Sequence, residues 1–442
     1  MSETVTPDAL PVSANEARHV IVVGAGLIGL CSALWLQRFG HRVTVVDREP
    51  PQPGASYRQA CSYGNACTVA LHACVPVATP GIALRVPGML LDRSGPLAIL
   101  LRHLPRLAPW LVGFVASSSR REVERIASVL GGLLAQAEPA WRPLIAEAGA
   151  LTHHAGCLYL YKSAAQYHAD DEETALRERH GVSLTRLNAT DIRELEPHLA
   201  PLYQHGILFR DAYTFDDPLA LALAIAAAIR ARGGSFVTGE ATELRPTEHG
   251  VAVRVGETEL LGDRAVLATG AHSKPLAQRL GDAVLLDTER GYHVLFPQGA
   301  RLLNRPVCYI EHGFYMTPMA QGLRAAGTVE LGGLAAPPQP ARTRAIRNIV
   351  ARLLPDAGEG TSEWLGFRPS MPDSLPVIGA ASASSRVTYA FGHGHLGLTL
   401  AGVTGKLVAQ RVSERAPCIP LEALRADRFR RFGWPRQPDR RS

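Results

Sequence analysis

The feature that most constrains the fold lies near the start of the chain. His19–Val23 is a short β-branched run of the kind found in strands that are buried on both faces. The glycine-rich run Gly-Ala-Gly-Leu-Ile-Gly follows at residues 24–29, and residues 30–39 are rich in helix formers. A second strand is predicted at residues 42–46, with Asp47 at its end. The predicted order is therefore strand, glycine turn, helix, strand and acid.

Each residue type in this run has a physical role in binding a dinucleotide. Gly24 allows a tight turn, Gly26 lets the backbone touch a pyrophosphate, and Gly29 lets the helix pack closely on the strand. The helix N-terminus offers free N–H groups and a partial positive charge to the phosphates. Asp47 can accept hydrogen bonds from both hydroxyls of the adenosine ribose. The sequence predicts dinucleotide binding, and the motif alone leaves NAD and FAD open.

A second glycine run lies near the other end of the chain. Gly-His-Gly-His-Leu-Gly at residues 392–397 follows the strand-like residues 387–391 and precedes the helix-like residues 398–412. The run lacks a second strand and an acid of its own, so it is not a second nucleotide-binding fold. A glycine loop that opens a helix is still a site for an anion or a carbonyl oxygen.

Composition excludes several classes of protein. Of the 442 residues, 46% are hydrophobic and 19% charged, which allows a large core and rules out wholesale disorder. The net charge of +6 comes largely from a basic stretch at residues 425–441 and requires no nucleic acid as a partner. The seven cysteines include no CxxC pair, and His153 and His154 have no matching pair at helical spacing. We therefore expect no metal site.

The sequence points to a cytoplasmic protein. No stretch reaches the roughly 20 apolar residues that a transmembrane helix needs. Isolated cysteines are typical of a reducing compartment, and the first 18 residues do not resemble a secretory signal. Peripheral contact with the inner face of the membrane stays open.

Segments of different character alternate along the chain. Residues 218–232 predict a buried helix and residues 265–270 a short buried strand, whereas residues 96–196 are mostly helical and residues 286–335 alternate like an antiparallel sheet. We expect an α/β fold in which a Rossmann-type domain is interleaved with an α+β substrate domain built on an antiparallel sheet. The predicted division assigns residues 18–90, 190–285 and 365–425 to the first domain, residues 91–189 and 286–364 to the second, and residues 1–17 and 426–442 to tails.

Several motifs together resemble one family of enzymes. Besides the first glycine run and Asp47, they are Ala-Cys-Ser-Tyr-Gly-Asn-Ala at residues 60–66, Pro-Val-Ala-Thr-Pro-Gly at 76–81, Ala-Thr-Gly at 268–270, Gly-Phe-Arg-Pro at 366–369 with Asp373, Pro376 and Gly379, and Gly-His-Gly at 392–394. In this order, from about residue 19 to 413, the chain resembles the D-amino-acid oxidase superfamily of FAD-dependent oxidoreductases. Within it, the match looks closest to the bacterial D-amino-acid dehydrogenases of the small-subunit type. The resemblance implies FAD, bound non-covalently because the segment around Arg368 holds no cysteine.

The resemblance also implies which residues hold the cofactor. Residues 60–66 line the flavin ring, residues 242–244 and 269–270 flank the adenine and phosphate side, and residues 393–399 wrap the pyrimidine edge. Backbone N–H groups in the last segment suit the negative charge that a reduced flavin develops at N1 and C2=O. The full predicted set is Gly24, Gly26, Leu27, Ile28, Gly29, Asp47, Arg48, Ser62, Gly64, Asn65, Ala66, Glu243, Leu244, Thr269, Gly270, His393, Gly394, Leu396, Gly397, Leu398 and Thr399.

Four side chains are predicted to face the substrate. Family members hold the substrate carboxylate with one arginine and one tyrosine, which match Arg368 and Tyr315. A guanidinium grips two oxygens at once and so fixes orientation. His395 in the second glycine run and Tyr292, next to His293, are further candidates for the cleft wall, although His395 could equally orient its loop. No general base is predicted, because a desolvated pocket itself lowers the pKa of the substrate amine.

The predicted reaction is hydride transfer from Cα of a D-amino or imino acid to flavin N5, as the resemblance implies. Electrons would pass to a quinone, the respiratory chain or O2 rather than to nicotinamide. D-proline or D-hydroxyproline is one candidate substrate, because Tyr63, Gly64 and His395 depart from the alanine-preferring members.

Three other functions stay open from the sequence. They are a glycine- or sarcosine-type FAD oxidase that forms hydrogen peroxide, an FAD-dependent 2-hydroxy-acid dehydrogenase, and a flavin-dependent scaffold without enzymatic activity. Arg368 could serve a hydroxy acid equally well, whereas the presence of both Arg368 and Tyr315 argues against the scaffold. The oligomeric state is not encoded in any pattern that we recognise.

Overall fold

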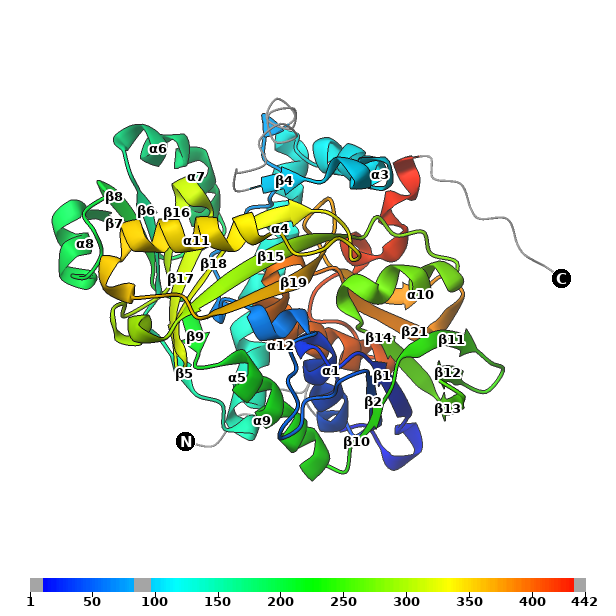
Figure 1. Ribbon diagram of the computed structural model, residues 1–442. Coiled ribbons are helices and arrows are strands. Elements are labelled where there is room, and N and C mark those ends of the chain that lie inside the picture. Colours follow the sequence, from blue (N-terminus) through cyan, green and yellow to red (C-terminus); the bar gives the residue numbers. More distant parts are fainter. Residues whose placement is uncertain (1–10, 83–96, 433–442) are drawn as a thin grey trace.

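Two β-sheets organise the molecule, a computed structural model that describes residues 11–82 and 97–432 (Figure 1). The six-stranded sheet has the order β10-β2-β1-β14-β21-β20, in which the first five strands are parallel and β20 is antiparallel. Residues 20–23 of β1 are almost completely buried, so the apolar run near the start of the chain forms the centre of this sheet. The strands are β1 (His19–Val23), β2 (Arg42–Asp47), β10 (Ser235–Thr238), β14 (Arg264–Leu267), β20 (Val377–Ala381) and β21 (Ser384–Phe391).

Helices cover one face of this sheet and a small sheet covers the other. On the first face, α1 (Leu27–Arg38) packs against α12 (Gly397–Val412), with α5 (Ala137–Ala148) and α9 (Pro218–Ala231) beside them. The contact between α1 and α12 is close because Gly405 has no side chain: a Cβ atom there would lie 2.6 Å from the carbonyl oxygen of Cys31. The other face carries α10 (Ser273–Arg279) and the antiparallel strands β11 (Ala241–Pro246), β12 (Val251–Val255) and β13 (Thr258–Gly262).

The second sheet, nine-stranded within the described residues, is largely antiparallel. Its order is β19-β15-β18-β17-β16-β6-β8-β7, with β4 paired to β18; the pairs β16–β6 and β18–β4 are parallel. The strands are β4 (Leu97–Ile99), β6 (Cys157–Tyr161), β7 (Leu184–Asn188), β8 (His205–Phe209), β15 (Asp287–Phe296), β16 (Val307–Tyr309), β17 (Phe314–Met319), β18 (Gly322–Leu331) and β19 (Ser362–Ser370).

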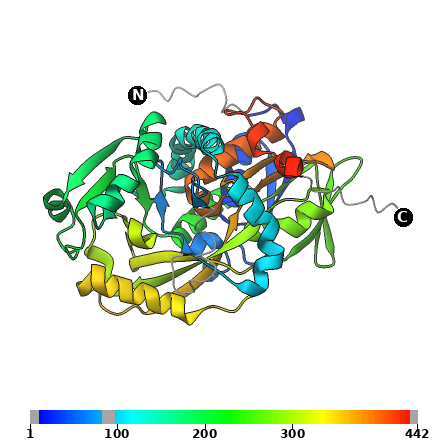
Figure 2. The ribbon, with the colours of Figure 1, turned by 90° about the horizontal axis from the view of Figure 1, so that it is seen from above.

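The two faces of the larger sheet have different neighbours. Helix α11 (Pro340–Leu353) packs on β15 and β18, where its buried residues join one hydrophobic cluster with Val294 and Ala325, and Figure 2 shows it along the outer side of the sheet. The opposite face of β15 and β19 is turned toward the six-stranded sheet. Side chains on that face alternate with those under α11, because successive residues of a strand point to opposite sides.

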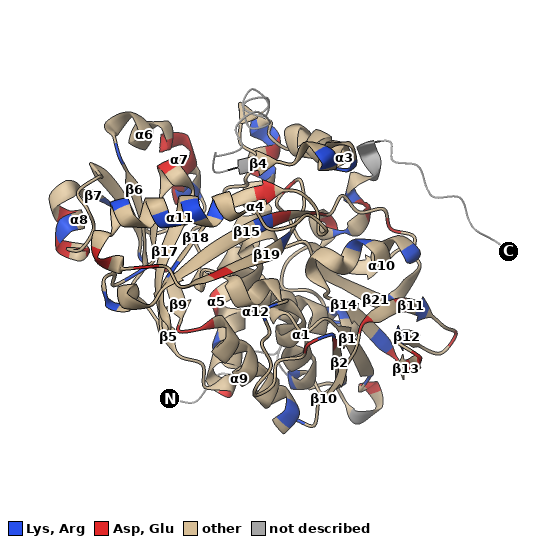
Figure 3. Cartoon of the chain, in the orientation of Figure 1, with Lys and Arg blue, Asp and Glu red and all other residues tan. Residues whose placement is uncertain are grey.

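The remaining described elements surround the two sheets. Both signs of charge are spread over these and the other elements (Figure 3). Within residues 11–82 and 97–432, no helix has both the length and the apolar character that crossing a membrane requires. The elements are α3 (Leu104–Ala116), α4 (Arg120–Ala135), α6 (Ala164–Ala169), α7 (Asp171–Arg179), α8 (Ala189–Leu195), and a small sheet of β3 (Thr68–Val69), β9 (Tyr213–Phe215) and β5 (Thr152–His153).

The α/β fold with an interleaved antiparallel sheet, expected from the sequence, is confirmed. The domain boundaries stay a prediction, and the packing departs from them at several elements. Strand β8 and most of β19 fall within the ranges predicted for the first domain yet belong to the nine-stranded sheet. Helices α4 and α5 fall within residues 91–189 yet pack against α12. An apolar helix face shows that a helix is covered but does not show which sheet or helix covers it.

Candidate active site

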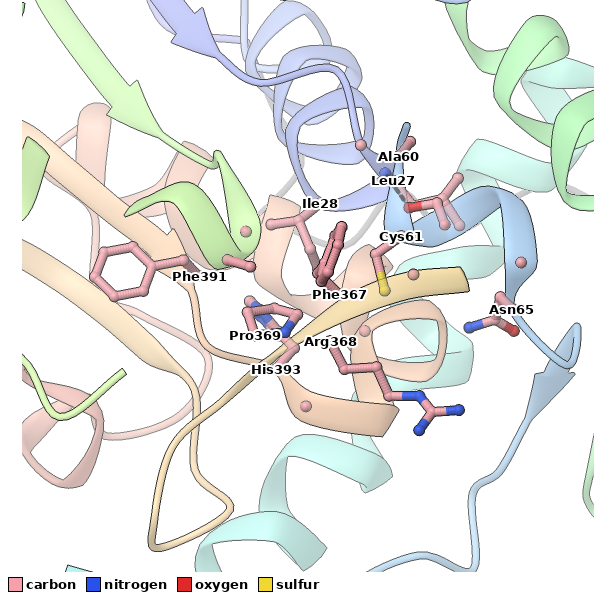
Figure 4. A pocket seen from close by; sticks show the side chains of 18 of the residues that line it. Leu27, Ile28, Ala60, Cys61, Asn65, Phe367, Arg368, Pro369, Phe391 and His393 are labelled. Carbon is pink, nitrogen blue, oxygen red and sulfur yellow. Dashed lines mark hydrogen bonds between the residues drawn. The ribbon is translucent and has the colours of Figure 1, made fainter. Parts of the chain in front are cut away.

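A cavity of about 650 Å³ lies between the two sheets, a volume typical of a ligand pocket. Its walls come from the turn between β1 and α1, the end of β2, residues 59–66, the end of β14, strands β15, β17, β18 and β19, and the loop before α12. Figure 4 shows Leu27, Cys61, Arg368 and His393 around this cavity. The fold thus brings residues from both ends of the chain to one place.

The first glycine run forms the turn that enters the cavity. Gly24 has a φ of 108°, and a Cβ atom there would lie 2.4 Å from the Ala268 carbonyl oxygen. At Gly29 a Cβ atom would lie 1.8 Å from the Gly24 carbonyl oxygen. Gly26 differs, because the nearest atom to its Cβ position is Ser62 Oγ at 3.6 Å. The packing of the protein therefore requires glycine at Gly24 and Gly29, whereas Gly26 leaves space in the cavity.

Asp47 is held at the end of β2 by two backbone groups. Its Oδ2 accepts a hydrogen bond from the Ala25 N–H at 2.6 Å, and its Oδ1 accepts one from the Glu49 N–H at 2.9 Å. Each carboxylate oxygen keeps a further lone pair, so Asp47 can still accept from ribose hydroxyls. Arg48 also lines the cavity, where its Nη2 lies 3.3 Å from His272 Nε2.

Residues 60–66 lie beside this turn and continue the cavity wall. The short 3₁₀ helix Cys61–Gly64 places Ser62 so that its Oγ accepts a hydrogen bond from the Leu27 N–H at 3.1 Å. Buried Arg324 fixes the segment from behind, donating from Nη1 to the carbonyl oxygens of Tyr63 and Asn65 at 3.0 and 2.7 Å. Hydrogen bonds to both carbonyls hold the loop in one conformation.

The second glycine run closes the cavity at the start of α12. His393 is buried, which lowers the pKa of its imidazole to about 3, and its Nε2 lies 2.9 Å from Thr404 Oγ1. Its Nδ1 has no hydrogen-bond partner within the described residues. Thr399 Oγ1 accepts from the Ala70 N–H at 3.0 Å and so ties α12 to the loop after β3.

The shape of the cavity fits FAD. A Cβ atom at Gly394 would meet no atom within 4 Å, and one at Gly270 or Gly397 would meet only an atom at 4.0 or 3.8 Å. Together with Gly26, these glycines leave a concave surface that added side chains would fill without touching protein. Such a surface allows close approach of a flat, phosphate-bearing ligand to backbone N–H groups.

Arg368 projects into the cavity from β19 with its charge unpaired. Within the described residues, its guanidinium makes no ion pair and no hydrogen bond. The guanidinium lies over Gly291 of β15: a Cβ atom at Gly291 would lie 2.5 Å from both Cζ and Nη2. Because Gly291 lacks a side chain, the fork has room to face the cavity and can receive a carboxylate.

Tyr315 lies on the same side of the cavity in β17. Its hydroxyl shares a hydrogen bond with the hydroxyl of Tyr159 at 2.6 Å, and Tyr159 in turn lies 3.2 Å from Nε2 of buried His72. Burial raises the pKa of Tyr315 well above the ordinary value for tyrosine. Tyr315 is therefore a neutral hydroxyl that is positioned by a second hydroxyl, and it can donate or accept a hydrogen bond.

Two further titratable groups line the cavity near Arg368. Removal from bulk solvent lowers the pKa of His395, a shift that Arg368 reinforces and Glu289 opposes. Burial raises the pKa of the Cys61 thiol to about 11, although Arg368 acts in the other direction. Both groups are therefore neutral near pH 7, and the charges at this end of the cavity are those of Arg368 and Glu289.

Most residues predicted from the sequence gather around the cavity, although their roles in binding stay predictions. Tyr292 and Leu244 do not: Tyr292 lies under α11, where its hydroxyl accepts from the Gln339 N–H at 3.1 Å, and Leu244 is in the core below β1. Glu243 does not line the cavity either: it is half-buried in β11, and its Oε2 lies 3.8 Å from Arg254 Nε. Gly29 and Thr399 lie directly behind the wall. The predicted residues that line the cavity are Gly24, Gly26, Leu27, Ile28, Asp47, Arg48, Ser62, Gly64, Asn65, Ala66, Thr269, Gly270, Tyr315, Arg368, His393, Gly394, His395, Leu396, Gly397 and Leu398.

The sequence analysis missed several residues of the same wall. Glu289 and Gly291 lie on the cavity side of β15, and Tyr159 stands behind Tyr315. Trp364 stacks on His293, with ring centroids 5.1 Å apart, and fills the space that Gly64 leaves. The sequence Glu-Arg-Gly-Tyr-His at residues 289–293 would have predicted Glu289 as a cavity residue only if the face of the strand that lines the cavity had been known.

Comparison with known proteins identifies a family. The family model described as FAD dependent oxidoreductase matches residues 19–411. A D-amino-acid oxidase of Bradyrhizobium diazoefficiens is 40% identical over 94% of this chain and 99% of its own length. A D-amino acid dehydrogenase of Methylobacterium nodulans is 31% identical over 93% and 99%. The crystal structure of glycine oxidase from Geobacillus kaustophilus has a TM-score of 0.72 at 20% identity and covers 93% of this chain and 99% of its own, which shows a shared fold.

Proposed function

Because this chain belongs to the FAD-dependent oxidoreductase family, we propose that it oxidises a D-amino or imino acid in the cavity between its two sheets. FAD supplies the hydride acceptor for such a reaction. The observation that carries the proposal is the unpaired guanidinium of Arg368, which faces the cavity over Gly291. The names of the two relatives, a D-amino-acid oxidase and a D-amino acid dehydrogenase, support the class and configuration of the substrate.

The side chains of this cavity bind and orient rather than exchange protons. Arg368 receives the substrate carboxylate through two N–H groups, and the Tyr315 hydroxyl donates a further hydrogen bond. This contact fixes the direction of the Cα–H bond, and positioning of that kind can supply a large part of a rate enhancement. His395 is neutral and adds no positive charge that would compete for the carboxylate.

Exclusion of water favours the reactive form of the substrate. The cavity walls are apolar at Cys61, Trp364 and Phe367. In such surroundings the charged ammonium form is disfavoured, so the substrate nitrogen loses its proton more readily and its lone pair can assist departure of the hydride. The imine product then hydrolyses in water or, for a proline-type substrate, stays cyclic.

The electron acceptor that we propose is a quinone, a respiratory-chain component or O2, and not nicotinamide. Within residues 11–82 and 97–432 the fold contains one complete dinucleotide-binding unit, β1–α1–β2, and the family match supports FAD as its ligand. A cytoplasmic protein with peripheral contact at a membrane surface would meet a quinone there. A glycine- or sarcosine-type oxidase is the second candidate, since the likeness to a D-amino-acid oxidase favours O2 as acceptor.

Anaerobic mixing of the flavin-loaded protein with single amino acids tests the proposal. We expect a D-amino or imino acid to bleach the oxidised-flavin absorption band and its L-enantiomer not to; the panel includes glycine, sarcosine, D-proline, D-hydroxyproline and 2-hydroxy acids. Arg368→Lys should lower kcat/KM about a hundredfold with an unchanged flavin spectrum, because lysine cannot form the fork. Peroxide formed with air as sole acceptor assigns the oxidase reaction, and bleaching by a 2-hydroxy acid alone contradicts the proposal.

A further inference from the structure

A second charged side chain faces the cavity beside Arg368. Glu289 of β15 lies directly opposite Arg368 of β19 in the antiparallel ladder, and both residues line the cavity. Residues paired in this way share one face of the sheet, with Cβ atoms about 5 Å apart. Glu289 is 7% exposed, so its carboxylate is largely withdrawn from bulk water. A buried carboxylate is costly unless a partner satisfies it.

These neighbouring opposite charges do not pair with each other. Within the described residues no ion pair joins them, and only Glu289 has another partner. The Arg368 guanidinium lies over Gly291, and Glu289 Oε1 accepts a hydrogen bond from Ser370 Oγ at 2.7 Å. Glu289 Oε2 has no hydrogen-bond partner in the described part of the chain. It is not completely buried, and Glu289 lines the cavity. The cavity wall therefore presents one free cation and one free carboxylate oxygen side by side.

This arrangement matches the two polar groups of an amino or imino acid. Such a substrate carries a carboxylate and an N–H-bearing nitrogen on neighbouring atoms, and it is cationic at nitrogen before it loses its proton. A 2-hydroxy acid offers the carboxylate and only a neutral O–H. A carboxylate accepts a hydrogen bond from either group, but it also attracts the positive charge that the nitrogen carries on arrival, so a free carboxylate favours the nitrogen.

We propose that Glu289 binds the substrate nitrogen: its Oε2 accepts a hydrogen bond from the amino or imino N–H while the substrate carboxylate lies on Arg368. This pair of charges selects amino and imino acids over 2-hydroxy acids. Ser370 holds the Glu289 carboxylate in place, and Gly291 leaves Arg368 the room to stay apart from it. The inference rests on the proposed oxidation of an amino or imino acid and adds the residue that recognises its nitrogen.

The test compares the flavin-loaded wild type with Glu289→Gln, which keeps the shape of the side chain and removes its charge. Two quantities are measured under anaerobic conditions: kcat/KM for flavin reduction by the best amino or imino acid, and Kd for tetrahydrofuran-2-carboxylate, which resembles proline but has no N–H. We expect kcat/KM to fall about ten- to hundredfold, the value of a charge-assisted hydrogen bond. Kd for the oxygen analogue should stay unchanged or fall, because that ligand has no N–H to donate to Glu289 and loses only a repulsive neighbour.

Two further variants keep the test informative. Asp287→Asn removes the same charge from the same face of β15, two residues earlier, where Asp287 pairs with His103 at 3.0 Å and does not line the cavity. We expect this control to retain the wild-type preference for an amine. Ser370→Ala leaves Glu289 charged but frees its carboxylate, so a smaller loss of kcat/KM in the same direction is expected, and this variant serves if Glu289→Gln does not fold.

The possible results separate two failures. If Glu289→Gln keeps the full preference for an amine, or if it weakens the oxygen analogue as much as the amino acid, the role of Glu289 is overturned while the proposed function stands. If no amino or imino acid reduces the wild-type flavin, the proposed function itself fails, and the variants are not needed to show it.

Discussion

Gly24, Gly26 and Gly29 belong to one motif, yet each lacks a side chain for a different reason. Gly24 needs its positive φ and its closeness to Ala268, and Gly29 needs its closeness to Gly24. Gly26 adopts an extended conformation open to any residue, and its Cβ position is free of protein contacts under 3.6 Å. The first and third glycines therefore serve the fold and the second serves the ligand.

Alanine substitutions should separate these roles. Gly24→Ala is expected to destabilise the protein by about 1–3 kcal/mol, through backbone strain and a Cβ clash, and to lower Tm even without flavin. Gly26→Ala should leave the Tm of the flavin-free protein close to wild type and weaken FAD binding about tenfold or more. Equal Tm losses for both variants, measured by thermal unfolding beside a flavin titration, would contradict this division.

Gly291→Ala tests whether the space above β15 positions Arg368. The new Cβ atom would lie 2.5 Å from the guanidinium, so the fork must move, and a displacement of about 1 Å can cost about a hundredfold in kcat/KM. In an Arg368→Ala background, Gly291→Ala should have no further effect, since the group that it displaces is gone. Losses that add up in the double variant would show that Gly291 acts in another way.

Strand β15 shows where sequence analysis of an element reaches its limit. The strand was predicted, but nearly all of its ten residues are buried, on one face by α11 and on the other at the cavity wall. The alternation expected over residues 286–335 does not tell the two sides of β15 apart, because polar residues on both faces, such as Glu289 and Arg290, are buried. Tyr292 was therefore placed on the cleft wall, whereas Glu289 and Gly291 occupy it and Tyr292 lies under α11.

The helices that sequence predicted best are those with a local signal where they begin. Helix α12 follows a glycine loop and a β-branched strand, and helix α9 begins after Asp217, whose side chain accepts a hydrogen bond from the Ala220 N–H at 2.8 Å. What the sequence could not supply is the contact of α1 with α12, because closeness at Gly405 depends on residues far away in the chain.

Two helix glycines, Gly405 in α12 and Gly132 in α4, offer a matched pair of alanine substitutions, one at a crowded position and one at an open position. Gly405→Ala should destabilise the protein by about 1–3 kcal/mol, because the Cβ atom would lie 2.6 Å from the Cys31 carbonyl oxygen. Gly132→Ala in α4 adds a Cβ atom with no neighbour within 4 Å and should stabilise by about 0.5–1 kcal/mol through helix propensity. Denaturant unfolding measures both; effects of the same sign would contradict the packing of α1 on α12.

At the scale of the whole molecule, the site is formed by segments far apart in the sequence that the two sheets bring together. Asp47 and Arg368 are separated by most of the chain, and the expectation that they meet came from a family resemblance, which the family match now confirms. Composition and periodicity alone indicated two interleaved domains with a ligand between them and left open which faces enclose that ligand. The face of each buried strand is set by packing between the sheets, which no local pattern encodes.

Buried histidines make the stability of the molecule sensitive to acid. Burial lowers the pKa of His72, His293 and His393 to about 3 from 6.5. The neutral folded form is therefore fully favoured above about pH 6.5, and stability is lost as pH falls toward 3 because the unfolded chain binds the protons. Each histidine should contribute a slope of about 1.4 kcal/mol per pH unit in that window.

The contribution of one histidine can be isolated. His72→Gln keeps a hydrogen-bonding group for Tyr159 and removes the titration. Unfolding free energies measured from about pH 7.5 to about pH 5.5 should fall less steeply for the variant, by about 1.4 kcal/mol per pH unit below 6.5. Identical slopes for the two proteins would show that His72 is accessible to protons in the folded state.

A crystal structure of the flavin-loaded protein with an unreactive carboxylate, such as tetrahydrofuran-2-carboxylate, tests the central claim most directly. The account predicts pyrophosphate at Gly26 and the N-terminus of α1, the flavin ring between residues 60–66 and the loop before α12, and the ligand carboxylate on both Arg368 nitrogens. A flavin outside this cavity, or a carboxylate bound elsewhere with Arg368 turned away, would contradict it.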